Sequence, residues 1–340
     1  MATSTLPGGL IAFGPDANCT LALCPLEASL LQYRPSLPAS ITFISVFGLS
    51  LLVHAAQGIR SKSWGFMSCM ISGCIFEVVG YIGRIIINDN PFDFGGFLIQ
   101  IICITVAPVF FCSAIYVLLS QVINLLDRSI SRCDPRLFYW IFIPCDIVSL
   151  VLQATGGALS CVASTKADID IGVDISLAGL IFQVVTLTIF FFLFADYMVL
   201  CWRSGPREKL TRRLLFFLLF LSLSVLFILI RCVYRIVELH EGYFSELFRE
   251  EVPFIILESG IMSIGVICLN IGHPSLAFGC HGPKKTELDP TDSGDSAYEL
   301  TNRLAVSAAL AAAEDQDTNN DSGMERKWVS RGFVKNFRKL

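Results

Sequence analysis

The sequence predicts an all-α membrane protein, a bundle of seven transmembrane helices with its N-terminus outside the cell and its C-terminus in the cytoplasm. Three observations support this prediction. Of the 340 residues, 54% are apolar and only 16% are charged, whereas a soluble domain is about 25% charged. Seven separate stretches are apolar over roughly 20 residues, the length that crosses a bilayer as a helix. Lys and Arg concentrate in alternate loops, which sets the orientation.

The apolar stretches divide the chain into three parts. Residues 1–36 form a predicted extracellular tail, residues 37–275 the transmembrane domain, and residues 276–340 a cytoplasmic tail. The last part is rich in Asp, Glu, Ser, Thr and Ala, so we expect it to be mostly disordered. The expected helices lie at 37–58, 65–87, 96–120, 138–163, 173–202, 214–239 and 252–273.

The orientation follows from the positions of the 25 Lys and Arg residues. If successive segments between helices alternate sides, nineteen of these residues fall on one face and three on the other, and the last three lie inside helices. Cytoplasmic loops carry the excess of positive charge. The N-terminus is therefore predicted to lie outside.

The N-terminal tail has two features that suit an extracellular location. Asn18-Cys19-Thr20 is an N-glycosylation sequon. Cys19 and Cys24 lie close together in a compartment that permits a disulfide. The alternative is an unused sequon beside two free thiols, and the residues alone do not decide between the two interpretations.

The far C-terminal end has an amphipathic pattern. Lys327, Arg331, Lys335 and Arg338 would share one face of a helix, and apolar residues would occupy another. Such a segment suits the anionic inner leaflet. The alternative is a disordered basic tail.

Polar and ionisable residues at membrane depth are the main functional signal, because a charge there is costly unless it is paired or faces water. The second and sixth helices each place three such residues on one face. In the predicted topology, six of the charged residues lie between the middle of the membrane and the outer surface, and Asp146 lies in the inner half. This candidate substrate pathway comprises Glu77, Tyr81, Arg84, Asp146, Gln153, Gln183, Arg231, Arg235, Glu238 and Glu258.

Two interpretations of this set remain open. One is a polar cavity in the bundle that opens outward. The other is a group of buried ion pairs, Glu77 or Glu258 against Arg231, that fix the register of the helices. Pairing alone does not account for the glutamines and the tyrosine in the same set, which favours the cavity.

Two backbone features concern packing. Gly156-Gly157 in the fourth helix is expected to permit close helix contact. Pro108 in the third helix is expected to kink it or to free a carbonyl group.

Several function classes are excluded. The formal charge of −4 is unlike that of a nucleic-acid binder. The sequence lacks a G-x-x-x-x-G-K-[ST] phosphate loop, which excludes an ATP-driven transporter in one chain. Its 13 cysteines form no CxxC or Cys/His cluster. We therefore expect no metal, no cofactor and no enzymatic activity.

A seven-helix receptor is the alternative from another class. Asp127-Arg128 resembles part of the DRY motif of G-protein-coupled receptors. Against this, the seventh helix has no NPxxY motif, and it has no Lys that could hold retinal. The four histidines are scattered, which argues against a seven-helix zinc hydrolase.

The ordered motifs resemble the fungal lipid-translocating exporter family, which includes sphingoid long-chain-base exporters and aminocholesterol-resistance proteins. The resemblance covers residues 33–275. Its motifs are Tyr33-x-Pro35-Ser36, Glu77-x-x-Gly80-Tyr81-x-x-Arg84, Gln100, Ala107-Pro108, Ala114, Tyr116, Asp146-x-x-Ser149-x-x-x-Gln153-x-x-Gly156-Gly157, Gly179, Gln183, Arg231-x-x-Tyr234-Arg235-x-x-Glu238, Gly242 and His273-Pro274.

The resemblance implies a multi-pass protein, located in the plasma membrane, that moves amphipathic lipids or confers resistance to hydrophobic toxic compounds. Membrane lipids or hydrophobic small molecules are then its partners. Two residues depart from the family pattern. Ser245 replaces a glycine, and Glu258 stands where an aspartate is usual.

The residues themselves indicate the chemistry of the substrate. A polar or cationic head group needs partners once it leaves water. Glu77 and Glu258 can pair with an ammonium group, and Gln153 and Tyr81 can bond hydroxyl groups. Together with the resemblance, which implies most of the substrate class, this predicts an exporter or translocator of sphingoid-base-like lipids or hydrophobic toxic compounds. The alternative is a seven-helix receptor-like sensor of lipid or membrane stress.

Overall fold

The computed structural model describes residues 5–6, 9–12, 14, 17–126, 135–162, 165–204, 212–241 and 249–273. Within these ranges, seven helical spans are long and apolar enough to cross a membrane, which confirms the predicted fold class. The side of the membrane on which each terminus lies stays a prediction. The predicted features outside the described residues are Asp127-Arg128, Gly242, Ser245, Pro274 and the tail at 276–340 with its basic end.

The seven spans follow the apolar stretches closely. A short hairpin of β1 (Thr5–Leu6) and β2 (Leu10–Ile11) and a 3₁₀ turn, η1 (Leu26–Ala28), precede them. The first six spans are α1 (Leu37–Ser61), α2 (Trp64–Asp89), α3 (Phe94–Leu126), α4 (Pro135–Val162), α5 (Lys166–Ser204) and α6 (Arg212–Glu241). The seventh consists of α8 (Glu251–Pro253), a π-helix η2 (Phe254–Gly260) and α9 (Ile261–Ile271).

Helix α5 departs most from its expected bounds. It begins at Lys166, seven residues before the predicted start, and has 39 residues. At 1.5 Å per residue its length is roughly 58 Å, well beyond the hydrocarbon thickness. The added turns contain Asp168 and Asp170. Hydropathy therefore marked the part that crosses lipid, and the helix continues past it.

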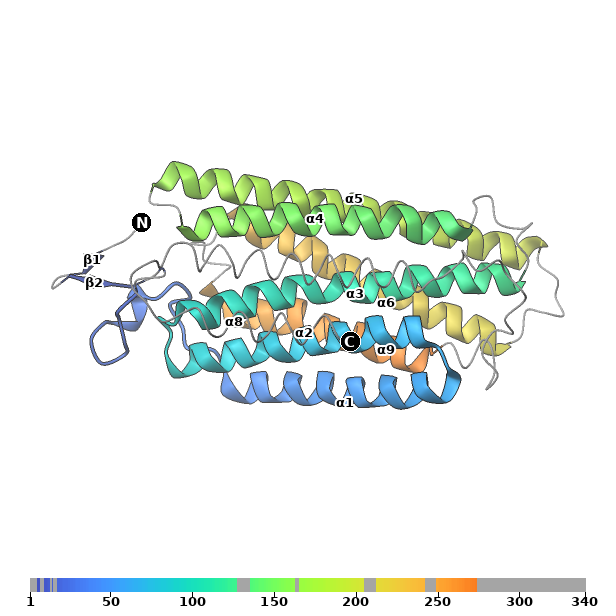
Figure 1. Cartoon of the computed structure of the whole chain (residues 1–340), viewed down its shortest axis with the longest axis horizontal. Coiled ribbons are helices and arrows are strands. Elements are labelled where there is room, and N and C mark those ends of the chain that lie inside the picture. The colour runs from blue at the N-terminus through green and yellow to red at the C-terminus, as the bar shows by residue number, and fades with distance from the viewer. Residues whose placement is uncertain are drawn as a thin grey trace, which may run out of the picture. The chain divides into compact units, whose positions relative to one another are not determined.

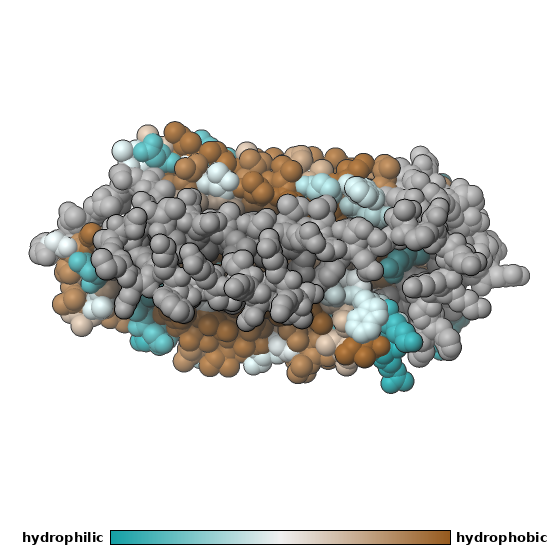
Figure 2. All heavy atoms as spheres, in the orientation of Figure 1, coloured by the Kyte–Doolittle hydropathy of each residue, from teal (hydrophilic) through white to brown (hydrophobic). Residues whose placement is uncertain are grey.

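Helix α3 is the most buried span. In the 18-residue apolar stretch of α3, 67% of the residues are buried inside the bundle, whereas in that of α1 the share is 22%. Helix α3 packs against α2, α4 and α6, and α1 packs against α2 and α9 (Figure 1). Large apolar side chains such as Leu49, Phe192 and Trp202 remain exposed. Much of the coloured surface in Figure 2 is accordingly apolar, as lipid contact requires.

Small residues bring α4 and α5 together. A Cβ atom on Gly156 would lie 2.5 Å from the Ser176 backbone nitrogen, and one on Gly172 would lie 2.6 Å from the Gly156 carbonyl oxygen. By contrast, nothing lies within 4 Å of a Cβ atom on Gly157. The adjacent glycines thus differ, and only Gly156 is needed for the close approach.

This difference gives a matched pair of variants. Gly156→Ala is expected to lower the free energy of unfolding by about 1–3 kcal/mol, because the new methyl group meets backbone that has no room to move. Gly157→Ala should be neutral or slightly stabilising, since alanine is the better helix former. Thermal unfolding in detergent measures both. Equal losses in the two variants would contradict the packing argument.

The N-terminal tail has a small core of its own. Cys19 and Cys24 form a disulfide with a Cα–Cα distance of 5.7 Å, and Phe92 from the α2–α3 connection packs against them. Asn18 is exposed, and its Oδ1 accepts a hydrogen bond of 2.7 Å from the Ile11 backbone. The sequon side chain therefore braces the hairpin, and glycosylation of Asn18 stays a prediction.

Hydrogen bonds fasten the end of this tail to α2. Arg34 Nε donates to the Asn88 carbonyl at 2.5 Å, and Asn88 Nδ2 donates to the Pro35 carbonyl at 2.6 Å. The Ser36 backbone donates to Glu251 Oε1 at 2.6 Å. These contacts hold the residues before α1 over the ends of α2 and the seventh span.

Candidate functional site

A buried group of charges lies where α2, α6 and η2 meet. It consists of Glu77, Arg231 and Glu258 and is called the inner group below. Arg231 Nε donates to Glu258 Oε1 at 2.9 Å, and Arg231 Nη2 pairs with the same oxygen. Glu77 interacts electrostatically with both residues. All three side chains are 1% exposed. Of the two pairings that the sequence left open, the structure contains Arg231 with Glu258.

Glu77 differs from Glu258 in having no salt bridge to another described residue. Among the described residues it forms no salt bridge, and its Oε1 accepts no hydrogen bond. The group therefore holds two carboxylates and one guanidinium, an excess of one formal negative charge when both acids are ionised. An uncompensated charge is costly at this depth, so we expect a proton or a further cation to neutralise it.

Pro108 helps to position Arg231. Proline has no backbone N–H, so Pro108 leaves the carbonyl four residues earlier in α3 without its helical donor. That carbonyl belongs to Ile104, and Arg231 Nη2 donates to it at 2.9 Å. The Arg231 guanidinium therefore makes three hydrogen bonds, two to Glu258 and one to the carbonyl group that Pro108 leaves free.

The π-helix positions Glu258. Its wider turns, closed by i→i+5 hydrogen bonds, recur at functional sites. Glu258 and Ser259 on η2 are both 1% exposed, and Ser259 has a side-chain interaction with Tyr81 of α2. Tyr81 in turn stacks on Phe43 and Phe47 of α1. The π-helix therefore directs two polar side chains toward α2.

A second group of charges lies nearer the end of the bundle where the N-terminal tail sits. Arg84 Nη2 donates to Tyr33 Oη at 3.0 Å and to Glu251 Oε1 at 3.1 Å, and its guanidinium lies 4.0 Å from the centre of the Phe254 ring. Burial raises the pKa of Tyr33, and Arg84 opposes that rise. Tyr33 is therefore a neutral acceptor at neutral pH. Arg235 pairs with Glu238 in the same region.

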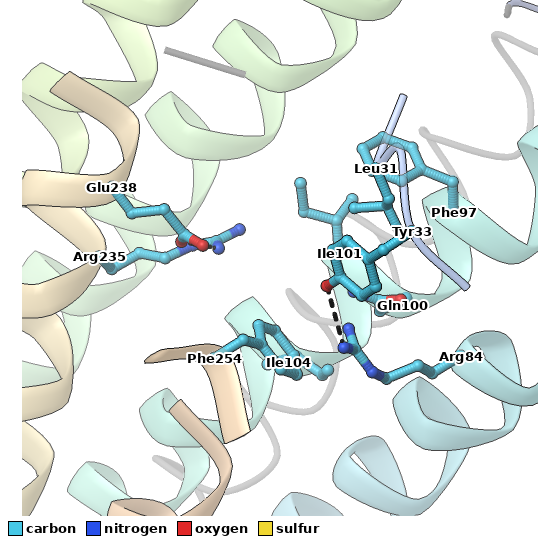
Figure 3. Close-up of a pocket in the computed structure, with 10 residues that line it drawn as sticks. All are labelled: Leu31, Tyr33, Arg84, Phe97, Gln100, Ile101, Ile104, Arg235, Glu238 and Phe254. Atoms are coloured by element: carbon cyan, nitrogen blue, oxygen red, sulfur yellow. Dashed lines mark hydrogen bonds and ion pairs between the residues drawn. The ribbon is translucent and has the colours of Figure 1, made fainter. Parts of the chain in front are cut away.

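A small cavity lies among Arg84, Arg235 and Glu238 of this second group (Figure 3). Its volume is about 20 Å³, enough for about one water molecule. Tyr33 and Leu31 of the tail close one side, and Ile104 connects the cavity wall to Arg231. The lining residues are Leu31, Tyr33, Arg84, Phe97, Gln100, Ile101, Ile104, Arg235, Glu238 and Phe254. At this volume the cavity does not accommodate a lipid head group.

The other predicted residues lie elsewhere in the bundle. Tyr116 of α3 donates to Asp146 Oδ2 at 3.0 Å. Gln153 of α4 donates to Gln183 Oε1 of α5 at 3.0 Å. None of these side chains lines the cavity. The structure thus brings Glu77, Tyr81, Arg231 and Glu258 together and places Arg84, Arg235 and Glu238 nearby, whereas the two glutamines bridge α4 and α5.

Three polar residues that contact Arg84 or line the cavity were missing from the predicted pathway. Tyr33 and Glu251 precede or begin helices, where a polar residue is common, and Gln100 is a single polar residue in an apolar helix. The resemblance had marked Tyr33 and Gln100, although it gave them no partner. Within the described residues, no three His, Cys, Asp or Glu side chains gather in a way that could hold a metal ion.

Comparison with known proteins identifies the family. A family model described as RTA1 like protein matches residues 70–281, a range that runs from α2 through α9 and contains both carboxylates of the inner group. The chain belongs to the RTA1-like family. No solved structure matches it.

Curated relatives of this RTA1-like chain come from Saccharomyces cerevisiae. The sphingoid long-chain base transporter RSB1 is 36% identical over 279 residues, which cover 72% of this chain and 73% of the relative. Protoporphyrin uptake protein 1 is 30% identical over 280 residues, 72% of this chain and 91% of the relative. Protein RTM1 is 27% identical over 216 residues, 63% and 69% of the two chains. RSB1 and protoporphyrin uptake protein 1 are both named for transport, which supports a role in membrane transport.

Proposed function

We propose that this RTA1-like protein moves cationic amphiphiles of the sphingoid-base class across the membrane. The observation that carries the proposal is Glu77, a buried carboxylate beside the Arg231–Glu258 pair that forms no salt bridge with any described residue. One ammonium group bound there would neutralise the excess charge. The relative RSB1 is named as a sphingoid long-chain base transporter, which supports the same class of substrate.

The small cavity indicates how the site would load. Tyr33 and Leu31 must move before a head group can reach Glu77 from the end where the tail lies. The hydrocarbon tail can remain in lipid between helices, so the cavity needs to enlarge only for the head. Binding energy from the new ion pair would offset the lost contacts between Tyr33 and Arg84.

Vesicles that contain only this protein test the proposal. A fluorescent sphingosine should redistribute between leaflets faster than in protein-free vesicles. The matched ceramide, whose nitrogen is acylated and uncharged, should not be accelerated. Protoporphyrin, which carries carboxylates, serves as the anionic comparison. Equal acceleration of sphingosine and ceramide would contradict recognition of the ammonium group.

Export at the plasma membrane, with resistance to toxic amphiphiles as its result, belongs to the same proposal. It requires the predicted orientation, in which the two ends of α5 face opposite sides. In intact cells, a membrane-impermeant thiol reagent is expected to label Thr165→Cys and to leave Ser204→Cys unlabelled, with the unmodified chain as background. Labelling of the Ser204→Cys variant instead would reverse the topology.

A further inference from the structure

Asp146 is a buried carboxylate that the proposed binding site does not use. It is 1% exposed in α4. Tyr116 donates a hydrogen bond to its Oδ2, and its Oδ1 accepts none from the described residues. The titratable side chains that interact with it include Tyr116 and Cys112 of α3, its neighbour Cys145, and Cys232 of α6.

Asp146 therefore contrasts with Glu258, which has Arg231. No basic side chain in the described part of the chain forms a salt bridge with Asp146. A carboxylate at membrane depth is stable when a proton or a cation neutralises it. Helix α5, the other helix packed on α4, presents Phe190 to Tyr116 at this level, with ring centroids 4.5 Å apart.

The surroundings of Asp146 differ on its two sides. Toward the start of α4, Tyr116 contacts Phe142 and Phe190, and Phe138 packs on both phenylalanines. These buried rings exclude water. Toward the Arg231 group, the side chains are polarisable instead. Cys112 interacts electrostatically with both Asp146 and Arg231, and so does Cys232.

We propose that Asp146 is the proton-coupling residue of this protein and that its proton travels in the direction opposite to the cation at Glu77. An ammonium group that pairs with Glu77 and Glu258 competes with Arg231 for the carboxylates. The released guanidinium can then turn past Cys112 toward Asp146, which gives up its proton. The aromatic side opens in the other conformation, where Asp146 regains a proton as the cation leaves.

The exchange balances. One proton leaves Asp146 for one monovalent cation bound at Glu77, and no covalent bond in the substrate forms or breaks. The inference rests on the proposed function, because it needs a cation at Glu77. It adds an energy source, the proton gradient, for which the chain has a separate buried acid.

A permanently charged probe makes the test clean, since a quaternary ammonium group cannot carry a proton itself. Purified protein in vesicles is given N-trimethylated sphingosine, with a pH-sensitive dye trapped inside. With an acidic interior, the probe should enter several-fold faster than without a gradient, and the interior should become less acidic as it enters. Asp146→Asn should move the probe at the rate seen without a gradient and should release no protons.

Two further variants separate the possible failures. Asp146→Glu keeps a titratable group and should retain a response to the gradient, which also decides the matter if Asp146→Asn does not assemble. Glu77→Gln should show neither movement nor proton release. A full gradient response in an assembled Asp146→Asn protein, or none in Asp146→Glu, would overturn the coupling role. If the unmodified protein moves the probe at one rate with or without a gradient, coupling fails and the proposed function stands. If it moves none, both fail.

Discussion

Replacing Glu77 by glutamine is expected to slow sphingosine movement by at least about tenfold while the protein keeps its fold. The substitution removes the one charge of the inner group that forms no salt bridge with another described residue. A hydrogen bond to a charged group contributes about 1.5–3 kcal/mol, and each 1.4 kcal/mol is about tenfold in affinity. Folding should not suffer, because the variant also removes the excess negative charge. The melting temperature should stay level or rise.

The controls for Glu77 distinguish charge from shape. Glu77→Asp keeps the charge and should retain part of the transport activity. Glu241→Gln removes an exposed acid at the end of α6 and should change neither transport nor stability. Sphingosine redistribution in vesicles and thermal unfolding in detergent provide the two measurements. Full activity in Glu77→Gln would remove the basis of the proposed site.

Arg231→Met is expected to have the largest effect on stability, a loss of about 3–5 kcal/mol. The substitution leaves Glu258 buried without its cation, beside Glu77, and leaves the Ile104 carbonyl without a donor. The double variant Arg231→Met/Glu258→Met removes both charges of the pair and should recover most of the loss. Denaturant unfolding of the two single variants and the double variant measures the coupling between the residues.

The ion pair with Arg231 also changes the expected effect of the Glu258→Gln substitution. As a pathway residue it was predicted to bind the head group, and Glu258→Gln would then affect transport alone. Because Glu258 pairs with Arg231, the glutamine leaves a buried guanidinium poorly compensated, and we expect reduced stability as well. A Glu258→Gln protein with unchanged melting temperature and lost transport would instead favour the original interpretation.

The sequence predicted the number and approximate bounds of the spans, because about 20 consecutive apolar residues have few alternatives to a membrane helix. The pairing of Arg231 was left open, since it depends on how α2, α6 and the seventh span rotate against one another. The π-helix has no signature in the apolar pattern. The tail residues that close the cavity could not be placed either, because contacts between Tyr33 and Arg84 join residues 51 positions apart.

The partners of Asp146 and Gln153 could not be predicted from the helix face that they share. Asp146 and Gln153 share one face of α4, and the sequence therefore placed both on one pathway. Along that face, however, Asp146 meets Tyr116 of α3, whereas Gln153 meets Gln183 of α5. A common face of a helix defines a common groove. The neighbours along the groove depend on how the helices cross, which one sequence does not encode in any local pattern.

The π-helix in the seventh span bears on how such proteins can diverge. A π-helix contains one residue more than the α-helix that it replaces. The side chains after η2 are therefore rotated about the helix axis by about 100° relative to those before it, the rotation of a single α-helical residue. The span has 21 residues, and one fewer would still cover roughly 30 Å. A one-codon deletion between Phe254 and Gly260 would therefore leave the number of membrane crossings unchanged while exchanging Glu258 for a neighbour at the binding position. The same deletion would separate Glu258 from Arg231, so the length of this one turn links substrate preference to the stability of the bundle.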